Sequence, residues 1–307
     1  MFQWKAKHCC VLAIIVASGL PVASGQATRT WVSGVGDDAN PCSRTAPCKT
    51  FAGAISKTSA GGEIDALDPG GFGAVTITKA ITLSGYGAYG SVLVSGTNGI
   101  VIAAGSSDVV VLQDLELNGI ALSGSPGLNG VSFNSGAQLV VKDCKILGFS
   151  QNGINVALNQ STNASVAVTN TSVTGGAVGL FFSNTGTGKL TGSLDRVTVE
   201  GAATGVETNS ANSFVTVNNS TLMNNSSFGV LGASGALSVE SSIFSSNGVA
   251  LQSNTGATVR VANNGIYDNL TGFGCGGGTL ASAGNNRKGN NVGGGSACTP
   301  TTTITVQ

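Results

Sequence analysis

Side chains that could carry acid–base chemistry are few and scattered in this sequence. The only histidine, His8, lies within an N-terminal segment that has the pattern of a removable signal. Without it, the remaining chain can form no Ser-His-Asp or Cys-His catalytic group and no imidazole metal site. Catalysis would therefore depend on carboxyl groups together with Arg or Lys.

The densest group of such residues is Asp195 and Arg196, followed by Glu200 and Glu207. Two carboxyl groups that face each other across a cleft can hydrolyse a glycosidic bond. Glu207, Asp195 and Arg196 are therefore the candidate catalytic residues. The competing interpretation is a solvated turn with a local ion pair, which is a frequent role of adjacent opposite charges.

Other acidic residues suggest no metal site. Asp37 and Asp38 are adjacent in a segment rich in Gly, Asp and Asn, where Asp commonly serves to form a turn. A calcium ion needs six or more oxygen ligands, normally with several carboxylates, and the sequence groups no such set. We therefore expect no metal and no other cofactor.

Residues 1–27 have the features of a secretory signal peptide. Lys5 and Lys7 precede an apolar run at residues 9–16, and small residues at 25–27 suit a cleavage site. No later stretch is apolar for twenty residues, so we expect a secreted protein, extracellular or periplasmic, without membrane insertion. Without Lys5 and Lys7, twelve basic residues face fourteen acidic ones. The resulting net charge of −2 does not favour nucleic acid as a partner.

Five cysteines remain after the signal. Because thiols of exported proteins usually pair, we expect the disulfides Cys42–Cys48 and Cys275–Cys298, one near each end of the chain. Cys144 is left over, and its position predicts a buried, inert thiol.

A repeat of 22 to 29 residues governs the middle of the chain. One column of apolar residues carries this spacing, and a second column precedes it by five residues in every repeat. The first column is Leu117, Ile146, Val173, Val199, Leu222, Phe244 and Ile266; the second begins at Leu112 and ends at Val261. Alternating strands with such a period predict a parallel β-helix of eight to nine coils, stacked about 4.8 Å apart.

The repeat also assigns turns and faces. A polar turn column, able to form a hydrogen-bonded ladder, comprises Asp114, Asp143, Asn170, Arg196, Asn219, Ser241 and Asn263. The next residue in each coil, Cys144 among them, should point inward, and Glu116 should pair with Lys145 on the neighbouring coil. A recurring Gly before an apolar residue should bend the chain into a new strand. Beyond it Val249 and its equivalents should point inward, whereas Ser132, Asn155, Phe181, Glu207, Leu231 and Ala250 should point outward, with Asn134, Asn209 and Gln252 at the strand ends.

The segment from about residue 30 to 85 resembles a known family. It contains Val-Ser, Gly-Asp-x-x-Asn-Pro, Pro-x-Lys-Thr-Phe-x-x-Ala-Ile, Gly-Gly-x-Ile and Pro-Gly in this order. This pattern is similar to secreted bacterial right-handed parallel β-helix proteins of the pectin-lyase-like superfamily. The resemblance implies an all-β solenoid with a short N-terminal capping helix, at residues 49–57. The expected organisation is a signal peptide (1–27), an N-terminal cap (28–71), a parallel β-helix (72–273) and a Gly-rich C-terminal cap (274–307).

The resemblance also implies where a ligand would lie. Relatives of this fold carry their substrates on the strand face that holds Asn155, Phe181, Glu207 and Asn209, which are therefore candidate carbohydrate-binding residues. The polygalacturonase signatures Asn-Thr-Asp, Gly-His-Gly and Arg-Ile-Lys are absent. We expect a non-catalytic secreted protein that binds a polysaccharide or a cell-surface glycan. One alternative is a polysaccharide lyase or glycoside hydrolase with a reduced active site, the only case in which calcium is expected, and another is a structural envelope or matrix protein.

Overall fold

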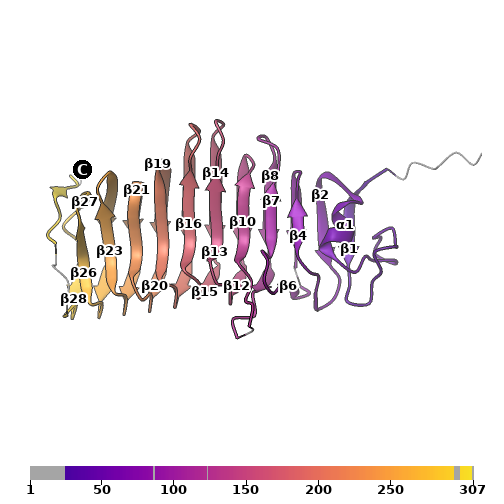
Figure 1. Ribbon diagram of the computed structural model, residues 1–307, viewed down its shortest axis with the longest axis horizontal. Coiled ribbons are helices and arrows are strands. Elements are labelled where there is room, and N and C mark those ends of the chain that lie inside the picture. Colours follow the sequence, from indigo (N-terminus) through magenta and orange to yellow (C-terminus); the bar gives the residue numbers. More distant parts are fainter. Residues whose placement is uncertain (1–24, 86, 123, 294–297, 306–307) are drawn as a thin grey trace, which may run out of the picture.

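The computed structural model describes residues 25–85, 87–122, 124–293 and 298–305. Residues 1–24 of the predicted signal peptide lie outside the described residues. The chain forms a long solenoid whose strands are stacked side by side from the N-terminal cap to the C-terminal end (Figure 1). No helix in the described part is long and apolar enough to cross a bilayer.

Each coil has three strand faces, which the chain visits in a fixed order. Face 1 consists of β4 (Val75–Ile77), β7 (Ile100–Ala103), β10 (Asn129–Ser135), β13 (Asn152–Leu158), β16 (Val178–Asn184), the first parts of β19 (Thr204–Asn218) and β21 (Phe228–Glu240), β23 (Val249–Asn254) and β26 (Thr271–Gly276). Face 2 consists of β1 (Ala27–Val32), β2 (Thr58–Ala66), β5 (Ile81–Ser84), β8 (Val109–Gln113), β11 (Gln138–Lys142), β14 (Ala164–Thr169), β17 (Leu190–Asp195), the second parts of β19 and β21, β24 (Ala257–Ala262), β27 (Thr279–Ser282) and β29 (Thr302–Thr303). Face 3 is a ten-stranded sheet of β3 (Gly70–Gly71), β6 (Gly90–Leu93), β9 (Leu115–Asn118), β12 (Lys145–Leu147), β15 (Ser172–Thr174), β18 (Thr198–Glu200), β20 (Thr221–Met223), β22 (Ile243–Ser245), β25 (Gly265–Tyr267) and β28 (Arg287–Gly289).

The fold class predicted from the repeat is confirmed. All pairings between these named strands are parallel and join successive coils, as in Ile146↔Val173 and Val173↔Val199. Face 3 contains ten strands, one from each coil, so the solenoid has slightly more coils than the eight to nine expected. The additional coils arise because β3 and β28 lie in segments without the recognisable repeat. Both apolar columns lie in the buried core, where every member is at most 2% exposed.

The predicted turn column lies at the corner between faces 2 and 3. Each of its seven members, from Asp114 to Asn263, has a positive φ between 48° and 55°. This left-handed conformation is most accessible to Asn and Asp among residues with a side chain, which explains their frequency in the column. Cys144 and the other residues that follow point inward as predicted, and Lys145 Nζ lies 3.8 Å from Glu116 Oε2 on the neighbouring coil.

The most continuous polar ladder is inside the solenoid rather than on the outer turn. The outer column makes isolated bonds, such as Asn170 Nδ2 to Asp143 Oδ1 at 2.6 Å. At the corner between faces 3 and 1, however, Asn225, Asn247 and Asn269 are at most 2% exposed. The Nδ2 atom of each donates to the Oδ1 atom of the next at 2.9 Å, and Asn269 donates to Asn291 in the same way. Buried amides are thereby satisfied without water.

The recurring Gly before face 1 has a different role from the predicted bend. Gly179 does not have a positive φ; a β-carbon there would lie 2.6 Å from the Gly205 carbonyl oxygen and even closer to Val199. Close approach of neighbouring coils therefore explains the glycine. The prediction for Val249 and Ala250 is wrong, because the turn before β23 is one residue shorter than in the preceding coil. Ala250 is fully buried, Leu251 pairs with Val230 in the inward column, and Gln252 takes the outward position.

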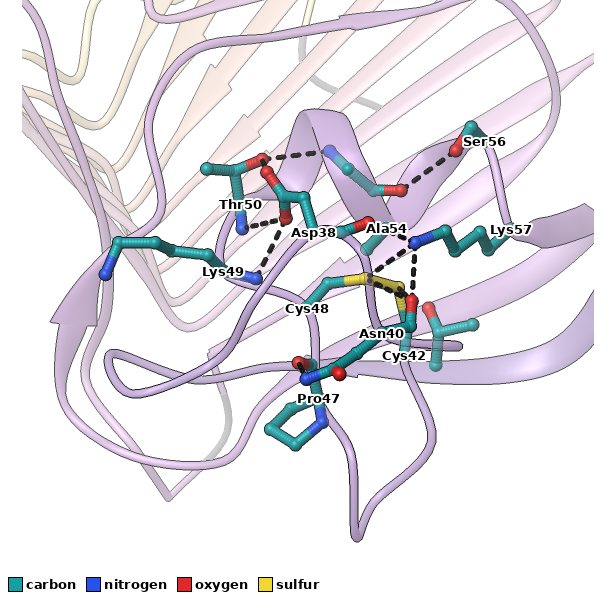
Figure 2. The surroundings of a disulfide bond; sticks show 12 residues. Asp38, Asn40, Cys42, Pro47, Cys48, Lys49, Thr50, Ala54, Ser56 and Lys57 are labelled. Carbon is teal, nitrogen blue, oxygen red and sulfur yellow. Dashed lines mark hydrogen bonds between the residues drawn. A yellow bond between two sulfur atoms is a disulfide. The ribbon is translucent and has the colours of Figure 1, made fainter.

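The N-terminal end carries α1 (Phe51–Ile55), the one helix in the described residues and shorter than the predicted 49–57. Thr50 is its N-cap and accepts a hydrogen bond from the Gly53 amide, while the Asp38 carboxylate accepts hydrogen bonds from the amides of Lys49 and Thr50, each at 2.9 Å (Figure 2). The Lys57 ammonium donates to the carbonyls of Asp38 and Asn40 and lies 3.6 Å from Cys48 Sγ. Asp38 therefore organises the turn and the helix start, as a turn former should.

Both predicted disulfides are present. Cys42 pairs with Cys48 within the loop between β1 and α1 (residues 33–50, called the cap loop), and Cys275 pairs with Cys298 near the C-terminal coils. Cys144 is a free, buried thiol, and its burial raises its pKa to about 12. A thiol with that pKa remains protonated at neutral pH and is unreactive as a nucleophile.

Candidate functional site

The predicted carbohydrate-binding residues line up on the outside of face 1. Strand register pairs Asn155 with Phe181, Phe181 with Glu207, and Glu207 with Leu231 on consecutive coils. Since successive parallel strands lie about 4.8 Å apart, these four side chains form one strip along the solenoid axis. We call Asn155, Phe181, Glu207 and Leu231 the face-1 strip.

Glu207 is the ionisable group of this strip. It lies between two apolar side chains, Phe181 and Leu231, and is only partly exposed. In the described part of the chain its carboxylate accepts no hydrogen bond and forms no ion pair. Loss of solvation on burial raises the pKa of Glu207 above its ordinary value. The site therefore holds a polar acceptor whose hydrogen-bonding capacity the chain itself does not use.

Replacing Glu207 with Gln should stabilise the protein at neutral pH, by less than about 1 kcal/mol. The folded-state pKa lies above the reference value of 4.5, so the contribution of Glu207 to the stability of the wild type is most favourable below that pH. This contribution is lost as the pH rises through the folded pKa. Chemical denaturation at pH 4 and pH 8 should therefore separate the two proteins only at pH 8. Glu240→Gln, at the exposed end of β21, controls for the loss of one charge, and a Glu207→Gln protein less stable than wild type at pH 8 would contradict the expectation.

The other predicted binding residues lie close by in register. Asn155 accepts a hydrogen bond from Asn152 at 3.2 Å and donates to Ser132 Oγ at 3.5 Å, so its amide is already held in place. Phe181 is partly exposed, whereas Asn209 is exposed at the end of the face-1 part of β19. The face-1 strip and Asn209 together thus present an aromatic ring, a carboxyl group and two amides.

Asp195 and Arg196 are not part of this strip. Arg196 occupies the corner between faces 2 and 3, and its Nη1 atom lies 2.6 Å from Asp195 Oδ2. Asp195 also accepts a hydrogen bond from Asn219 at 2.9 Å. The strand β18 and a second corner separate this pair from Glu207, because Asp195 ends β17 on face 2 whereas Glu207 lies in the face-1 part of β19. The fold therefore does not bring the three candidate catalytic residues together.

Metal-binding geometry is not found in the described residues, where no three His, Cys, Asp or Glu side chains gather closely enough to hold an ion. Two hollows of the described surface lie away from the face-1 strip. Their volumes are about 450 and 560 Å³, and both flank the loop after β5 (Gly85 and residues 87–90 of the described chain), at the cap end of faces 2 and 3. Tyr89, in this glycine-rich loop, is 85% exposed.

Comparisons with known proteins leave the activity open. No family model matches the chain, and no curated protein matches its sequence. Among solved structures, the crystal structure of pectate lyase Pel9A is similar at 15% identity and a TM-score of 0.46, covering 90% of this chain and 74% of that chain. A likeness of this degree establishes no shared activity, so the fold rests on the strand register described above. By that register the chain is an all-β protein with the fold of a parallel β-helix.

Proposed function

We propose that this protein binds a polysaccharide on face 1, through Asn155, Phe181, Glu207 and Asn209. The observation that carries the proposal is the Glu207 carboxyl, partly buried beside Phe181 and left without a partner in the described chain. A sugar hydroxyl would donate to this carboxylate while the sugar ring packs against the phenyl ring. Aromatic side chains supply apolar area at small entropic cost, and fixed amides add direction.

Rigidity supports binding of a chain rather than of a single sugar. The strip is built on parallel strands in continuous register, so its side chains repeat about every 4.8 Å along a straight axis. Consecutive units of a polysaccharide lying along this axis would meet equivalent positions on consecutive coils. Contacts that are weak individually then add up along the chain.

The proposed binding is non-catalytic. Hydrolysis by paired carboxyl groups needs two acids on opposite sides of the bond, and Glu207 is the one carboxyl in the described face-1 strip. Secretion belongs to the same proposal, because the two disulfides are compatible with an oxidising, extracellular compartment.

A screen of neutral and acidic polysaccharides by affinity electrophoresis tests this function. We expect at least one polymer to retard the protein while releasing neither reducing ends nor unsaturated products. Retardation together with product release would replace the proposal by the enzyme alternative. If no polymer retards the protein, polysaccharide binding is refuted.

A further inference from the structure

The 450 Å³ hollow at the cap end lies on the outer side of face 2. Its floor is a column of four outward side chains on successive coils, Trp31, Asp65, Ser84 and Gln113, in strand register. Arg44 of the cap loop and Gly87 and Ala88 of the loop after β5 line its walls. The hollow is therefore elongated along the solenoid axis, and it shares no residue with the face-1 strip.

Charged groups in this hollow occur as a compensated set. Arg29 Nε lies 2.5 Å from Asp65 Oδ2, and Arg29 Nη2 lies 3.8 Å from Glu63 Oε1. Arg44 is exposed and makes no hydrogen bond or ion pair within the described residues. A hydrogen bond with Asp65 raises the pKa of Glu63, with burial and the Asp65 charge acting in the same direction. The hollow is thus lined by two guanidinium groups and two carboxyl groups, whose formal charges sum to zero. Because only 9% of the residues in the chain are charged, four charged side chains around one hollow are a local concentration.

An aromatic side chain completes the set. Trp31 is partly exposed on the floor, with the Arg29 guanidinium 5.7 Å from its ring centroid. Neighbouring donors and acceptors, held by an ion pair, match adjacent hydroxyl groups of a sugar ring. An indole ring supplies apolar surface for the C–H face of the same ring. Compensated charge favours a ligand without charge of its own, because a charged polymer would meet repulsion from one half of the set.

The hollow continues beyond the loop. The second hollow, of about 560 Å³, is also lined by Gly87 and Ala88, so the two meet at this loop. Tyr89, 85% exposed, lines the second one. Together they offer room for several sugar units with an aromatic side chain in each hollow.

We infer that these two hollows form a binding site for a neutral saccharide chain, which lies from Trp31 towards Tyr89 and is hydrogen-bonded by Arg29, Arg44 and Asp65. This inference extends the proposed function by a second, separate site with its own ligand class. The ion pair supplies a donor and an acceptor to adjacent hydroxyls, Arg44 supplies further donors, and Trp31 packs against the ring.

Titration calorimetry with neutral hexasaccharides of β-1,4-linked glucose, β-1,4-linked xylose and α-1,4-linked glucose tests the site on the full-length protein. We expect at least one to bind and Arg44→Ala and Asp65→Asn each to weaken it about tenfold or more. Tyr89→Ala should weaken the hexasaccharide but not the corresponding disaccharide. Arg44 and Tyr89 are exposed, so these two variants test the site even if Asp65→Asn does not fold.

Face-1 variants separate the two proposals. Phe181→Ala and Glu207→Gln should leave hexasaccharide binding in the hollows within about twofold of wild type. If no neutral hexasaccharide binds, or if Arg44→Ala and Tyr89→Ala bind it as wild type does, the inference is overturned while polysaccharide binding on face 1 can still hold. If Arg44→Ala loses polymer binding while Phe181→Ala binds the polymer fully, the hollows are supported as the binding site and binding on face 1 is refuted.

Discussion

Replacing Asn247 with Ala is expected to lower the free energy of unfolding by about 4 kcal/mol, since each buried polar group left without a partner costs about 1–3 kcal/mol. The Asn247 side chain donates to the Leu222 carbonyl and to Asn269 Oδ1, each at 2.9 Å. It also accepts from the main-chain and side-chain nitrogens of Asn225, at 3.1 and 2.9 Å. With alanine, all four of these groups lose a partner at a position that is 1% exposed.

Chemical denaturation followed by circular dichroism measures this loss. Asn209→Ala is the matched control, because Asn209 is an exposed asparagine in the same solenoid, and its side chain makes no hydrogen bond within the described residues. The control should stay within about 0.5 kcal/mol of wild type. An Asn247→Ala protein as stable as the control would mean that the internal ladder does not contribute to stability.

Gly179→Ala should be the second most damaging of the single changes considered, with an expected loss of about 3 kcal/mol from overpacking. The added β-carbon would meet the Gly205 carbonyl oxygen and the Val199 side chain, which belong to the next coil. Main chain in a parallel sheet cannot move aside without breaking the register of its neighbours. The coils would therefore have to separate locally at the transition into face 1.

Gly71→Ala provides the comparison for this change. At Gly71 the nearest atom to an added β-carbon is Ser91 Oγ at 3.7 Å, an ordinary contact, and the same denaturation experiment should find little change. Equal stability of the Gly179→Ala and Gly71→Ala proteins would contradict the close approach of the coils. The role of Gly as a bend, expected from the sequence, would predict a much smaller difference between them.

The repeat columns explain how much of the fold was predictable from the sequence. Apolar spacing located the core, and Asp or Asn at a fixed offset located the left-handed corner of each coil. These features are local, because each coil repeats them independently. The register at Val249 was not predictable in the same way, since a turn shortened by one residue leaves Ala250 at a position where other coils have glycine.

The internal asparagine ladder was missed for a different reason. An inward column is expected to be apolar, and asparagines at 225, 247 and 269 look like turn residues when each coil is read alone. Their amides are hydrogen-bonded mainly by the neighbouring coils. The hydrogen bonds that these buried amides require are therefore formed between repeats, by residues that are 22 positions apart in the sequence.

The candidate site was predictable in part. Alternation placed Asn155, Phe181 and Glu207 outward, and strand register joins them in one strip. The hollows beside Trp31 and Tyr89 depend on how the cap loop and residues 87–89 lie beside face 2. Loop placement leaves no periodic signal, so the grouping of Arg29, Arg44 and Asp65 becomes visible only in three dimensions.

Titration of Phe181→Ala and Glu207→Gln with the polysaccharide selected by the screen tests binding on face 1 most directly. Phe214→Ala is the matched control, because Phe214 is an exposed aromatic residue on face 2. We predict that both face-1 variants bind about tenfold or more weakly than wild type, with the control unchanged. Wild-type affinity in both face-1 variants would contradict the proposed binding site.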